Sequence, residues 1–532
     1  MTRAVLYSFV ESGVHNMRVA THPAARKTCD CKSESIRIAT CRTRLLILAL
    51  IGLAALCAIT CSRPHTLNVR DFGAKGDGIT DDYEAMRSAA EALCSVPAAT
   101  LIYPRGTYRI NRYRITGGPA HNSVTNIRYL GCKGVKIIGE GAKIDVKGTF
   151  RRTVGYSDAT NVFSYESSVI PFEMIDSTGF RISGFDINGN VNMMSRDPGV
   201  VEGSMAGILT TNCKDYLISN VNVHHFATDG ITLGGNSLVA DQQVELRNVT
   251  STYNARQGLS IIQVRHAAII NSAFSFNGRT GQYGIHAPAA GVNVQALRRP
   301  PEEDVYTGLV TFDNCRFEEN IGPQFISAWP EGVDSVTVKT SFIKATGGDT
   351  SGTAFMNAPR TGVTSSNTFE ISAGHSVALA VYKPEQYSRI VHLTYDRNLF
   401  HLGDNRGIVP PLQASPIDFV NNDVRIASPT VDRTLLRLDY LNLVKGNRFF
   451  VANTGYSGLH YTILYEYGKA TIRDNRYETD RTGPGYFDVY YGSEINRSGE
   501  TFPNPANFQM HDVRPVATLQ PVSSSSRQGA VK

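Results

Sequence analysis

Three side chains in the middle of the chain have types and spacing that suit acid–base chemistry. Asp229, Arg256 and His286 lie 27 and 30 residues apart and supply a carboxylate, a permanent positive charge and an imidazole. An imidazole or a carboxylate can accept a proton from a bound molecule, and an arginine can stabilise the negative charge that this creates. These residues are the catalytic candidates, although Asp229 before Gly230 is also an ordinary turn pair.

Four more side chains are candidates for binding the same molecule. Tyr283 lies three residues before His286 and could share in proton transfer. Asn293 and Gln295 carry neutral amides, which bind hydroxyl groups but cannot act as an acid pair. Trp329 is the one tryptophan of the chain and precedes a proline, so its ring could stack on a ligand from a loop or pack in the core.

A repeat of short strands would bring such distant residues together. Asparagine recurs between apolar segments, with Thr340 filling one vacancy, at Asn220, Asn248, Asn271, Asn314, Asn367, Asn398, Asn422, Asn447 and Asn475. The steps are 28, 23, 43, 26, 27, 31, 24, 25 and 28 residues, and a period in the twenties indicates a solenoid. Asparagine tolerates the left-handed backbone of a tight corner, and stacked copies can hydrogen-bond to one another. We therefore predict a parallel β-helix that turns a corner at each of these residues.

A second column, of glycines, runs in step with the first. Gly207, Gly230, Gly258 and Gly291 each precede a strand with apolar residues at alternate positions. The alternation predicts inward side chains at Ile231, Leu233, Leu259, Ile261, Val292 and Val294, and outward ones at Thr232, Ser260 and Asn293. Because equivalent positions of neighbouring coils lie about 4.8 Å apart, the candidate residues would converge on one outer face.

The segment before the coils carries a distinctive motif. Residues 71–82 read Asp-Phe-Gly-Ala-Lys-Gly-Asp-Gly-Ile-Thr-Asp-Asp, and residues 103–108 read Tyr-Pro-Arg-Gly-Thr-Tyr. Between them, four apolar residues have the spacing of one helix face: Met86, Ala89, Ala90 and Leu93. Over residues 67–110 this combination resembles the opening of the pectate-lyase-like, polygalacturonase-related superfamily, which is similar to glycoside hydrolase family 28. The likeness continues as a pattern of coils to about residue 480.

The resemblance implies an all-β fold with one helix. A right-handed parallel β-helix would span residues 67–480, and a capping α-helix near 81–96 would cover its open N-terminal end. Residues 481–532 would form a C-terminal extension that is disordered at its low-complexity end. The acidic residues of the capping motif are assigned to structure, not to catalysis, because none lies on a predicted strand face.

The resemblance also implies activity on an acidic, pectin-like polysaccharide that contains uronate. Uronate β-elimination needs a base and a positive charge, which the cluster around Arg256 and His286 supplies. Glycoside hydrolysis needs two carboxyl groups, of which Asp229 is one and the other is not evident. A lyase is therefore favoured slightly over a hydrolase. A polysaccharide-binding envelope or adhesin-type β-helix without catalysis, and a uronate epimerase, are the alternatives.

Two motifs known in the superfamily are missing from the coil region. The Gly-His-Gly of polygalacturonases does not occur there, and neither does the Arg-x-Pro-x-x-Arg of calcium pectate lyases. No carboxylates or cysteines cluster with metal-ligand spacing, so we expect neither a metal ion nor an organic cofactor. Cys94, Cys132, Cys213 and Cys315 are expected to be buried free thiols, with a disulfide as the alternative in an exported protein.

The first 61 residues differ from the rest of the chain. They hold eight Lys/Arg and three Asp/Glu, a balance of +5, whereas the remainder holds 45 and 44, so nearly all of the net charge of +6 belongs to this leader. We therefore expect no nucleic-acid partner. Residues 45–60 carry no charge and have the length of a signal-peptide core, with a retained membrane anchor as the alternative. The leader predicts an exported protein: secreted, periplasmic or associated with the cell envelope.

Overall fold

The computed structural model describes residues 65–512 apart from short segments. These are 112–125, 148, 151–155, 158–161, 164–167, 194, 197–203, 236–241, 280–287, 297–306, 347–351, 382–387, 404–406, 412–415, 428–433, 453–460, 466–467, 481–486, 493–494 and 504–507. The leader predicted over residues 1–61, with its apolar segment 45–60, lies outside the described residues, as do 513–532. No helix among the residues described is long and apolar enough to cross a membrane.

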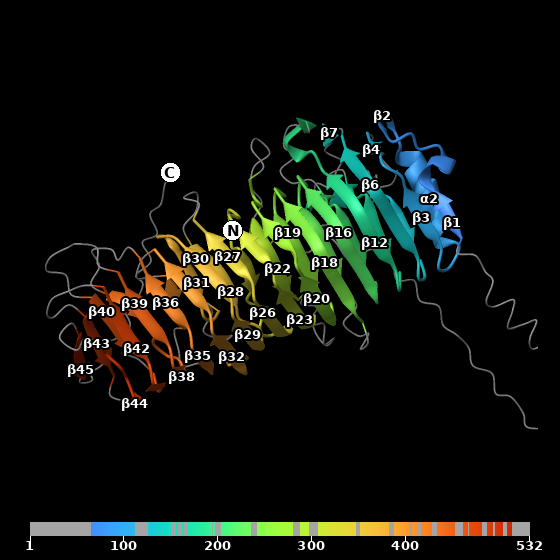
Figure 1. Ribbon diagram of the computed structural model, residues 1–532. Coiled ribbons are helices and arrows are strands. Elements are labelled where there is room, and N and C mark those ends of the chain that lie inside the picture. The colour runs from blue at the N-terminus through green and yellow to red at the C-terminus, as the bar shows by residue number, and fades with distance from the viewer. Residues whose placement is uncertain are drawn as a thin grey trace, which may run out of the picture. The chain divides into compact units, whose positions relative to one another are not determined.

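The described chain winds through two large parallel sheets, coil after coil (Figure 1). A ten-stranded sheet consists of β5 (Arg128–Leu130), β11 (Phe172–Ile175), β15 (Ile208–Thr211), β17 (Asp229–Gly234), β19 (Gln257–Ile262), β22 (Ala290–Gln295), β25 (Phe325–Ser327), β28 (Gly352–Asn357), β31 (His375–Ala378) and β34 (Ile408–Val409). Between successive strands of this sheet the chain passes through a 25-stranded sheet. The parallel β-helix predicted from the two columns is confirmed.

The 25-stranded sheet receives strands from every coil. It consists of β1 (Thr66–Asn68), β2 (Asp77–Asp81), β3 (Thr100–Tyr103), β4 (Thr107–Ile110), β6 (Lys136–Val146), β12 (Arg181–Asn188), β16 (Tyr216–His224), β18 (Val244–Thr252), β20 (His266–Ile270), β21 (Ala273–Ser275), β23 (Thr307–Asp313), β24 (Arg316–Glu318), β26 (Val333–Lys339), β27 (Phe342–Ala345), β29 (Thr361–Ser365), β30 (Thr368–Ile371), β32 (His392–Asp396), β33 (Leu399–Leu402), β35 (Ile417–Val420), β36 (Asp423–Ile426), β38 (Leu443–Lys445), β39 (Arg448–Val451), β41 (Thr471–Arg473), β42 (Arg476–Thr479) and β44 (Asn496–Ser498).

Smaller elements lie along the coils. Short pairs join β7 (Thr149–Phe150) to β13 (Ser195–Arg196), β8 (Tyr156–Ser157) to β9 (Val162–Phe163), and β10 (Ser168–Val169) to β14 (Ser204–Met205). Two 3-10 helices are η1 (Val69–Phe72) and η2 (Val191–Met193).

The coils continue beyond residue 480, where the sequence pattern placed their end. A four-stranded parallel sheet contains β37 (Thr434–Arg437), β40 (Tyr461–Tyr465), β43 (Phe487–Tyr491) and β45 (Phe508–Asp512). β44 also extends the 25-stranded sheet by pairing with β41. The boundary was placed too early because the asparagine column ends at Asn475 while the strand pairing does not.

The asparagine column has two parts with different roles. Asn220, Asn248, Asn271, Asn314 and Thr340 are the corner residues, with φ values of 52, 54, 51, 53 and 49°. Their exposed side chains stack, for example through the Asn248 Nδ2 donor and the Asn220 Oδ1 acceptor, 3.1 Å apart. In β16 the corner also reverses the alternation of side chains, so that Ile218 and Val221 both face the core.

The prediction is wrong by one residue for the later part of the column. From Asn367 onward the left-handed residue is the preceding one, for example Arg397 before Asn398 and Asn421 before Asn422. The column asparagines themselves are buried and form an inner ladder: Asn367, Asn398, Asn422, Asn447 and Asn475. Each satisfies backbone groups that the corner would leave without partners. The earlier coils place Ser272, Cys315 and Ser341 at the equivalent inner position.

A further buried ladder explains the glycine column. Asn254, Asn277 and Asn320 link neighbouring coils through side-chain amides at 2.8–2.9 Å, and Gln324 accepts the last amide within the coil of Asn320 at 2.8 Å. A Cβ atom at Gly230, Gly258 or Gly291 would lie within 2.6–2.9 Å of the amide nitrogens of Asn254, Asn277 and Asn320 respectively. Glycine recurs because the ladder leaves no room for a side chain. The six predicted inward residues after these glycines are all fully buried.

The N-terminal cap is held by a helix, a disulfide and carboxylates. α2 (Tyr83–Cys94) buries Met86, Ala89, Ala90 and Leu93, as its spacing predicts. Cys94 is bonded to Cys132 of the first coil, so the expectation of free thiols is wrong for this pair, while Cys213 and Cys315 are free and buried. The capping helix brings Cys94 beside Cys132, a proximity that the sequence separation of 38 conceals.

The carboxylates of the capping motif serve the backbone, as predicted. Asp82 accepts hydrogen bonds from the N–H groups of Lys75 and Gly76, at 2.6 and 3.2 Å. Backbone N–H donors of Thr80 and Ile79 lower the pKa of Asp77 to about 2. These contacts fix the glycine-rich turn against α2.

We expect Asn422→Ala to destabilise the protein far more than Asn314→Gly. Asn422 donates to Asn447 Oδ1 and to the carbonyl of Tyr395, and it accepts from Asn398. Its loss leaves buried groups unpaired and should lower the free energy of unfolding by at least about 2 kcal/mol. Asn314 is exposed at a left-handed corner that glycine accepts, so its replacement should cost about 0.5 kcal/mol or less. Denaturant titration measures both, and equal losses would contradict the two roles.

Removing the Cys94–Cys132 link should loosen the cap. The double variant Cys94→Ser/Cys132→Ser should lose roughly 2–4 kcal/mol of stability, because the bond closes a 38-residue loop. Thermal unfolding with and without reductant provides the measurement. Reductant should shift the wild type to the value of the double variant and leave that variant unchanged. A Cys213→Ala control, at a free buried thiol, should keep the response to reductant.

Candidate functional site

The outer face of the ten-stranded sheet brings most of the described candidate residues together. Strand pairing places Thr232 beside Ser260 and Ser260 beside Asn293. In the same way Asp229 lies beside Gln257, the residue after Arg256. Residues 28 to 33 positions apart in the sequence thus become neighbours on adjacent strands.

Asp229 and Arg256 form a bidentate ion pair on this face. Arg256 donates Nε to Oδ1 at 2.7 Å and a terminal nitrogen to Oδ2 at 2.8 Å. Ser260 and Thr232 donate their hydroxyls to Oδ2 at 2.7 and 2.9 Å. Asp229 is fully buried, while the side chain of Arg256 is 29% exposed. The carboxylate is therefore occupied by four donors and orients the guanidinium toward the outer surface.

Neutral amides continue the site along the sheet. Gln257 donates its Nε2 to Ser260 Oγ, and Asn293 donates its Nδ2 to Gln295 Oε1 at 3.4 Å. Gln257 Oε1 and Asn293 Oδ1 are buried and have no hydrogen-bond partner among the described residues. Buried acceptors without a donor are costly, so these two oxygens are suited to the hydroxyl groups of a ligand.

Of the three remaining candidates, the structure describes Trp329 but not Tyr283 or His286. Tyr283 and His286 lie outside the described residues, in the segment 280–287 that leads to β22. Trp329 is partly buried against the core and follows Ile326, the strand partner of Asn293, by three residues. It therefore sits at the exit of the sheet, on the side of Gln295, whereas Arg256 precedes its strand on the entry side.

A second arginine–carboxylate pair lies on the same face and was not predicted from the sequence. Arg128 donates Nε to Glu173 Oε2 at 2.8 Å, across the adjacent strands β5 and β11. Glu173 is 8% exposed, between the fully buried Phe172 and Met174. The alternation of Phe172, Glu173 and Met174 is visible in the sequence, but no column residue marks these early coils.

His224 and His225 lie elsewhere, on the 25-stranded sheet. His224 contacts His225 between Nδ1 atoms at 2.7 Å and Asp186 Oδ1 through Nε2 at 3.1 Å. The hydrogen bond with His224 lowers the pKa of Asp186, and burial lowers that of His225. His225 stacks on Tyr253 with ring centroids 5.2 Å apart.

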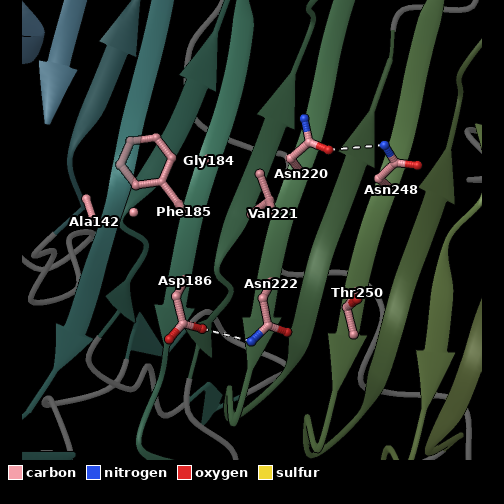
Figure 2. Close-up of a pocket in the computed structure, with 10 residues that line it drawn as sticks. Ala142, Gly184, Phe185, Asp186, Asn220, Val221, Asn222, Asn248 and Thr250 are labelled. Atoms are coloured by element: carbon pink, nitrogen blue, oxygen red, sulfur yellow. Dashed lines mark hydrogen bonds between the residues drawn. The ribbon is translucent and has the colours of Figure 1, made fainter. Parts of the chain in front are cut away.

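A surface hollow of about 430 Å³ lies on the 25-stranded sheet, and Figure 2 shows the residues that line it. Its lining comprises Gly141, Ala142, Gly184, Phe185, Asp186, Asn220, Val221, Asn222, Asn248 and Thr250. The hollow arises because Gly141 and Gly184 take the corner positions that Asn220 and Asn248 fill in the next coils. Its lining contains no cationic residue, so it is less suited than the ten-stranded sheet to an anionic ligand.

No group of three or more His, Cys, Asp or Glu side chains that could hold a metal ion occurs in the described part of the chain.

Part of the chain resembles known proteins in sequence. Residues 66–286 match the family described as rhamnogalacturonase A/epimerase, pectate lyase-like. Alginate lyase 7 of Azotobacter vinelandii is 26% identical over 221 residues, which cover 37% of this chain and 24% of that protein. Mannuronan C5-epimerase AlgE2 of the same organism is 24% identical over 246 residues, covering 40% of this chain and 22% of that protein.

A solved structure shows a more distant likeness. The A-module of the Azotobacter vinelandii mannuronan C-5 epimerase AlgE4 covers 84% of this chain and 98% of the module, with 14% identity and a TM-score of 0.35. The chain spans about a quarter of the length of the two curated relatives. The resemblance to the pectate-lyase-like superfamily is confirmed, and the matched segment includes both Asp229 and Arg256.

We expect Arg256→Ala to leave a buried carboxylate without its main partner. The variant should lose about 2–3 kcal/mol of unfolding free energy, because Asp229 stays buried while its bidentate donor is gone. The double variant Arg256→Ala/Asp229→Asn should recover part of that loss, since an uncharged amide can still pair with Ser260 and Thr232. Denaturant titrations of the two variants and of Asp229→Asn complete the cycle. Additive losses would show that the pair is not coupled.

Proposed function

We propose that this protein acts on a uronate-containing polysaccharide by removing the proton beside the uronate carboxylate. The observation that carries the proposal is Arg256, a partly exposed guanidinium held in place by the fully buried Asp229. A long parallel sheet face offers an extended surface for a polymer. The relatives named as alginate lyase and mannuronan C5-epimerase support the choice of a uronate substrate.

In this proposal Arg256 binds the carboxylate of the reacting sugar. Removal of the adjacent proton leaves a carbanion whose charge spreads into that carboxylate, and the guanidinium stabilises it. Asp229 acts as a positioning residue, because its oxygens are engaged by Arg256, Ser260 and Thr232. His286 or Tyr283 remains the predicted group for the proton transfer.

Two outcomes can follow proton removal. In a lyase, the bond from the neighbouring carbon to the glycosidic oxygen breaks, a carbon–carbon double bond forms, and the leaving oxygen takes a proton. In an epimerase, a proton returns to the same carbon from the opposite face and no bond of the chain is broken. Both reactions need the same positive charge at the carboxylate, so Arg256 serves either.

Hydrolysis is less well supported by the geometry. It requires two carboxyl groups, one of which delivers a proton to the leaving oxygen. On the described part of this face, Asp229 and Glu173 are the carboxylates, and each is bound to an arginine. Neither is placed to act as an unpaired acid.

A binding protein without catalysis is the second candidate. The unpartnered oxygens of Gln257 and Asn293 favour it, because they suit neutral hydroxyl groups and need no reaction. Export belongs to the proposal in either case. The Cys94–Cys132 disulfide supports it, since such bonds persist in oxidising compartments.

The reaction can be tested with the full chain and a panel of polymannuronate, polyguluronate, polygalacturonate and a neutral glucan. Ultraviolet absorbance reports the double bond, reducing ends report chain cleavage, and NMR reports the sugar configuration. We expect either absorbance with new ends or a changed configuration, on uronate polymers alone. New ends without absorbance would establish a hydrolase instead, and retained binding without any product would establish the binding protein.

Arg256→Gln should lower kcat by about a hundredfold or more, because the developing charge loses its fixed donor. Arg247→Gln is the matched control: Arg247 is 46% exposed, pairs with Glu245 and lies on β18 of the other sheet. Folding of both variants is checked by circular dichroism. Unchanged turnover in a folded Arg256→Gln variant would remove Arg256 from the reaction.

A further inference from the structure

We propose that Arg128 binds a second carboxylate of the same polymer, several sugar units away from the one at Arg256. This inference rests on the proposed function and extends its site along the sheet. It assigns a specificity role to a residue outside the candidate cluster: the Arg128–Glu173 pair would make the protein select long, repeatedly charged chains.

The Arg128–Glu173 pair has the same construction as the Arg256–Asp229 pair. In both, a largely buried carboxylate accepts the Nε–H of an arginine from the neighbouring coil, at 2.8 and 2.7 Å, with side-chain exposures of 11% for Glu173 and 1% for Asp229. In both, the guanidinium is the exposed partner, with 57% exposure for Arg128 and 29% for Arg256. A buried carboxylate that fixes a guanidinium at the surface orients a cation toward an anionic ligand.

Strand register places the two arginines along one surface. Successive strand partners from β5 to β22 form a single outward row: Arg128, Glu173, Leu209, Thr232, Ser260 and Asn293. Arg256 precedes β19, which lies four strand spacings from β5 in the ten-stranded sheet. Four spacings correspond to roughly 19 Å. A polymer that crosses the strands would therefore meet the two cations at separated sugar units.

The charged residues of this sheet lie in its N-terminal half, as two arginine–carboxylate pairs. Within the described strands of the ten-stranded sheet, the Asp, Glu, Arg and Lys residues are Arg128, Glu173 and Asp229, and Arg256 adjoins β19. Between the two arginines the row holds Glu173, which is bound to Arg128, and then the uncharged, partly exposed Leu209 and Thr232. The later strands β25, β28 and β34 carry no such charge.

The test compares oligouronates from the disaccharide to the octasaccharide, with the full chain as wild type, Arg128→Gln and Arg247→Gln. Affinity is measured by calorimetry at rising salt, with a neutral oligosaccharide series as the ligand control. We expect Arg128→Gln to weaken octasaccharide binding about three- to tenfold, by loss of one partly exposed charge contact, and to leave the disaccharide unchanged. Arg247→Gln should bind every length as the wild type does.

The outcomes separate this inference from the proposed function. If Arg128→Gln binds long and short oligouronates as the wild type does, or weakens both equally, the second subsite is excluded while the site at Arg256 stands. If the wild type binds no oligouronate of any length, the proposed function fails and the subsite fails with it. Glu173→Gln gives an independent check, because it should reduce the same length dependence without removing the cation.

Discussion

Hydrogen bonding between the corners of successive coils is the interaction on which the rest of the structure depends. A parallel β-helix must turn its backbone sharply several times per coil, and each turn leaves buried donors and acceptors that the sheets cannot pair. Here the amides of Asn254 and Asn277, and farther along those of Asn398 and Asn422, pair these groups from coil to coil. Since each amide contacts its equivalents in neighbouring coils, the ladders also hold the register. A slip by one residue would break every contact in the ladder at once.

Register, in turn, creates the site. Arg256 meets Asp229 because β17 and β19 are paired in one alignment, and the Gly230–Asn254 contact fixes where β17 begins. The ladder that excludes side chains inside the coil therefore positions the charged residues outside it. An enzyme or a binding protein built in this way needs no separate scaffold for its binding surface.

Much of this could be predicted from the sequence because repetition is a strong signal. The fold class, the capping helix and the inward residues after the glycines followed from period and alternation. The pairing of Cys94 with Cys132 and of Arg128 with Glu173 could not be predicted, because each depends on distances across coils that carry no repeated residue. The one-residue shift at Asn367 could not be predicted for a related reason. Asparagine suits both an exposed left-handed corner and a buried amide ladder, and the sequence does not distinguish these two roles. Asp229 was predicted to converge with Arg256 on one sugar, but the sequence does not reveal that four donors occupy its carboxylate.

The four hydrogen bonds to the carboxylate of Asp229 affect how a site of this kind would bind a ligand. An arginine free to move would lose conformational entropy each time it met a carboxylate, and an isolated cation on an open sheet would hold an anionic polymer by charge alone. Pairing with a buried carboxylate reduces both effects, because the guanidinium is oriented in advance and its charge is partly compensated. A ligand carboxylate then competes for the outward side of the guanidinium. The ligand binds more weakly when its carboxylate loses the negative charge. Under this constraint, selectivity for a polyanion must come from several modest contacts spaced along the sheet, which is the arrangement that two arginine–carboxylate pairs on one face provide.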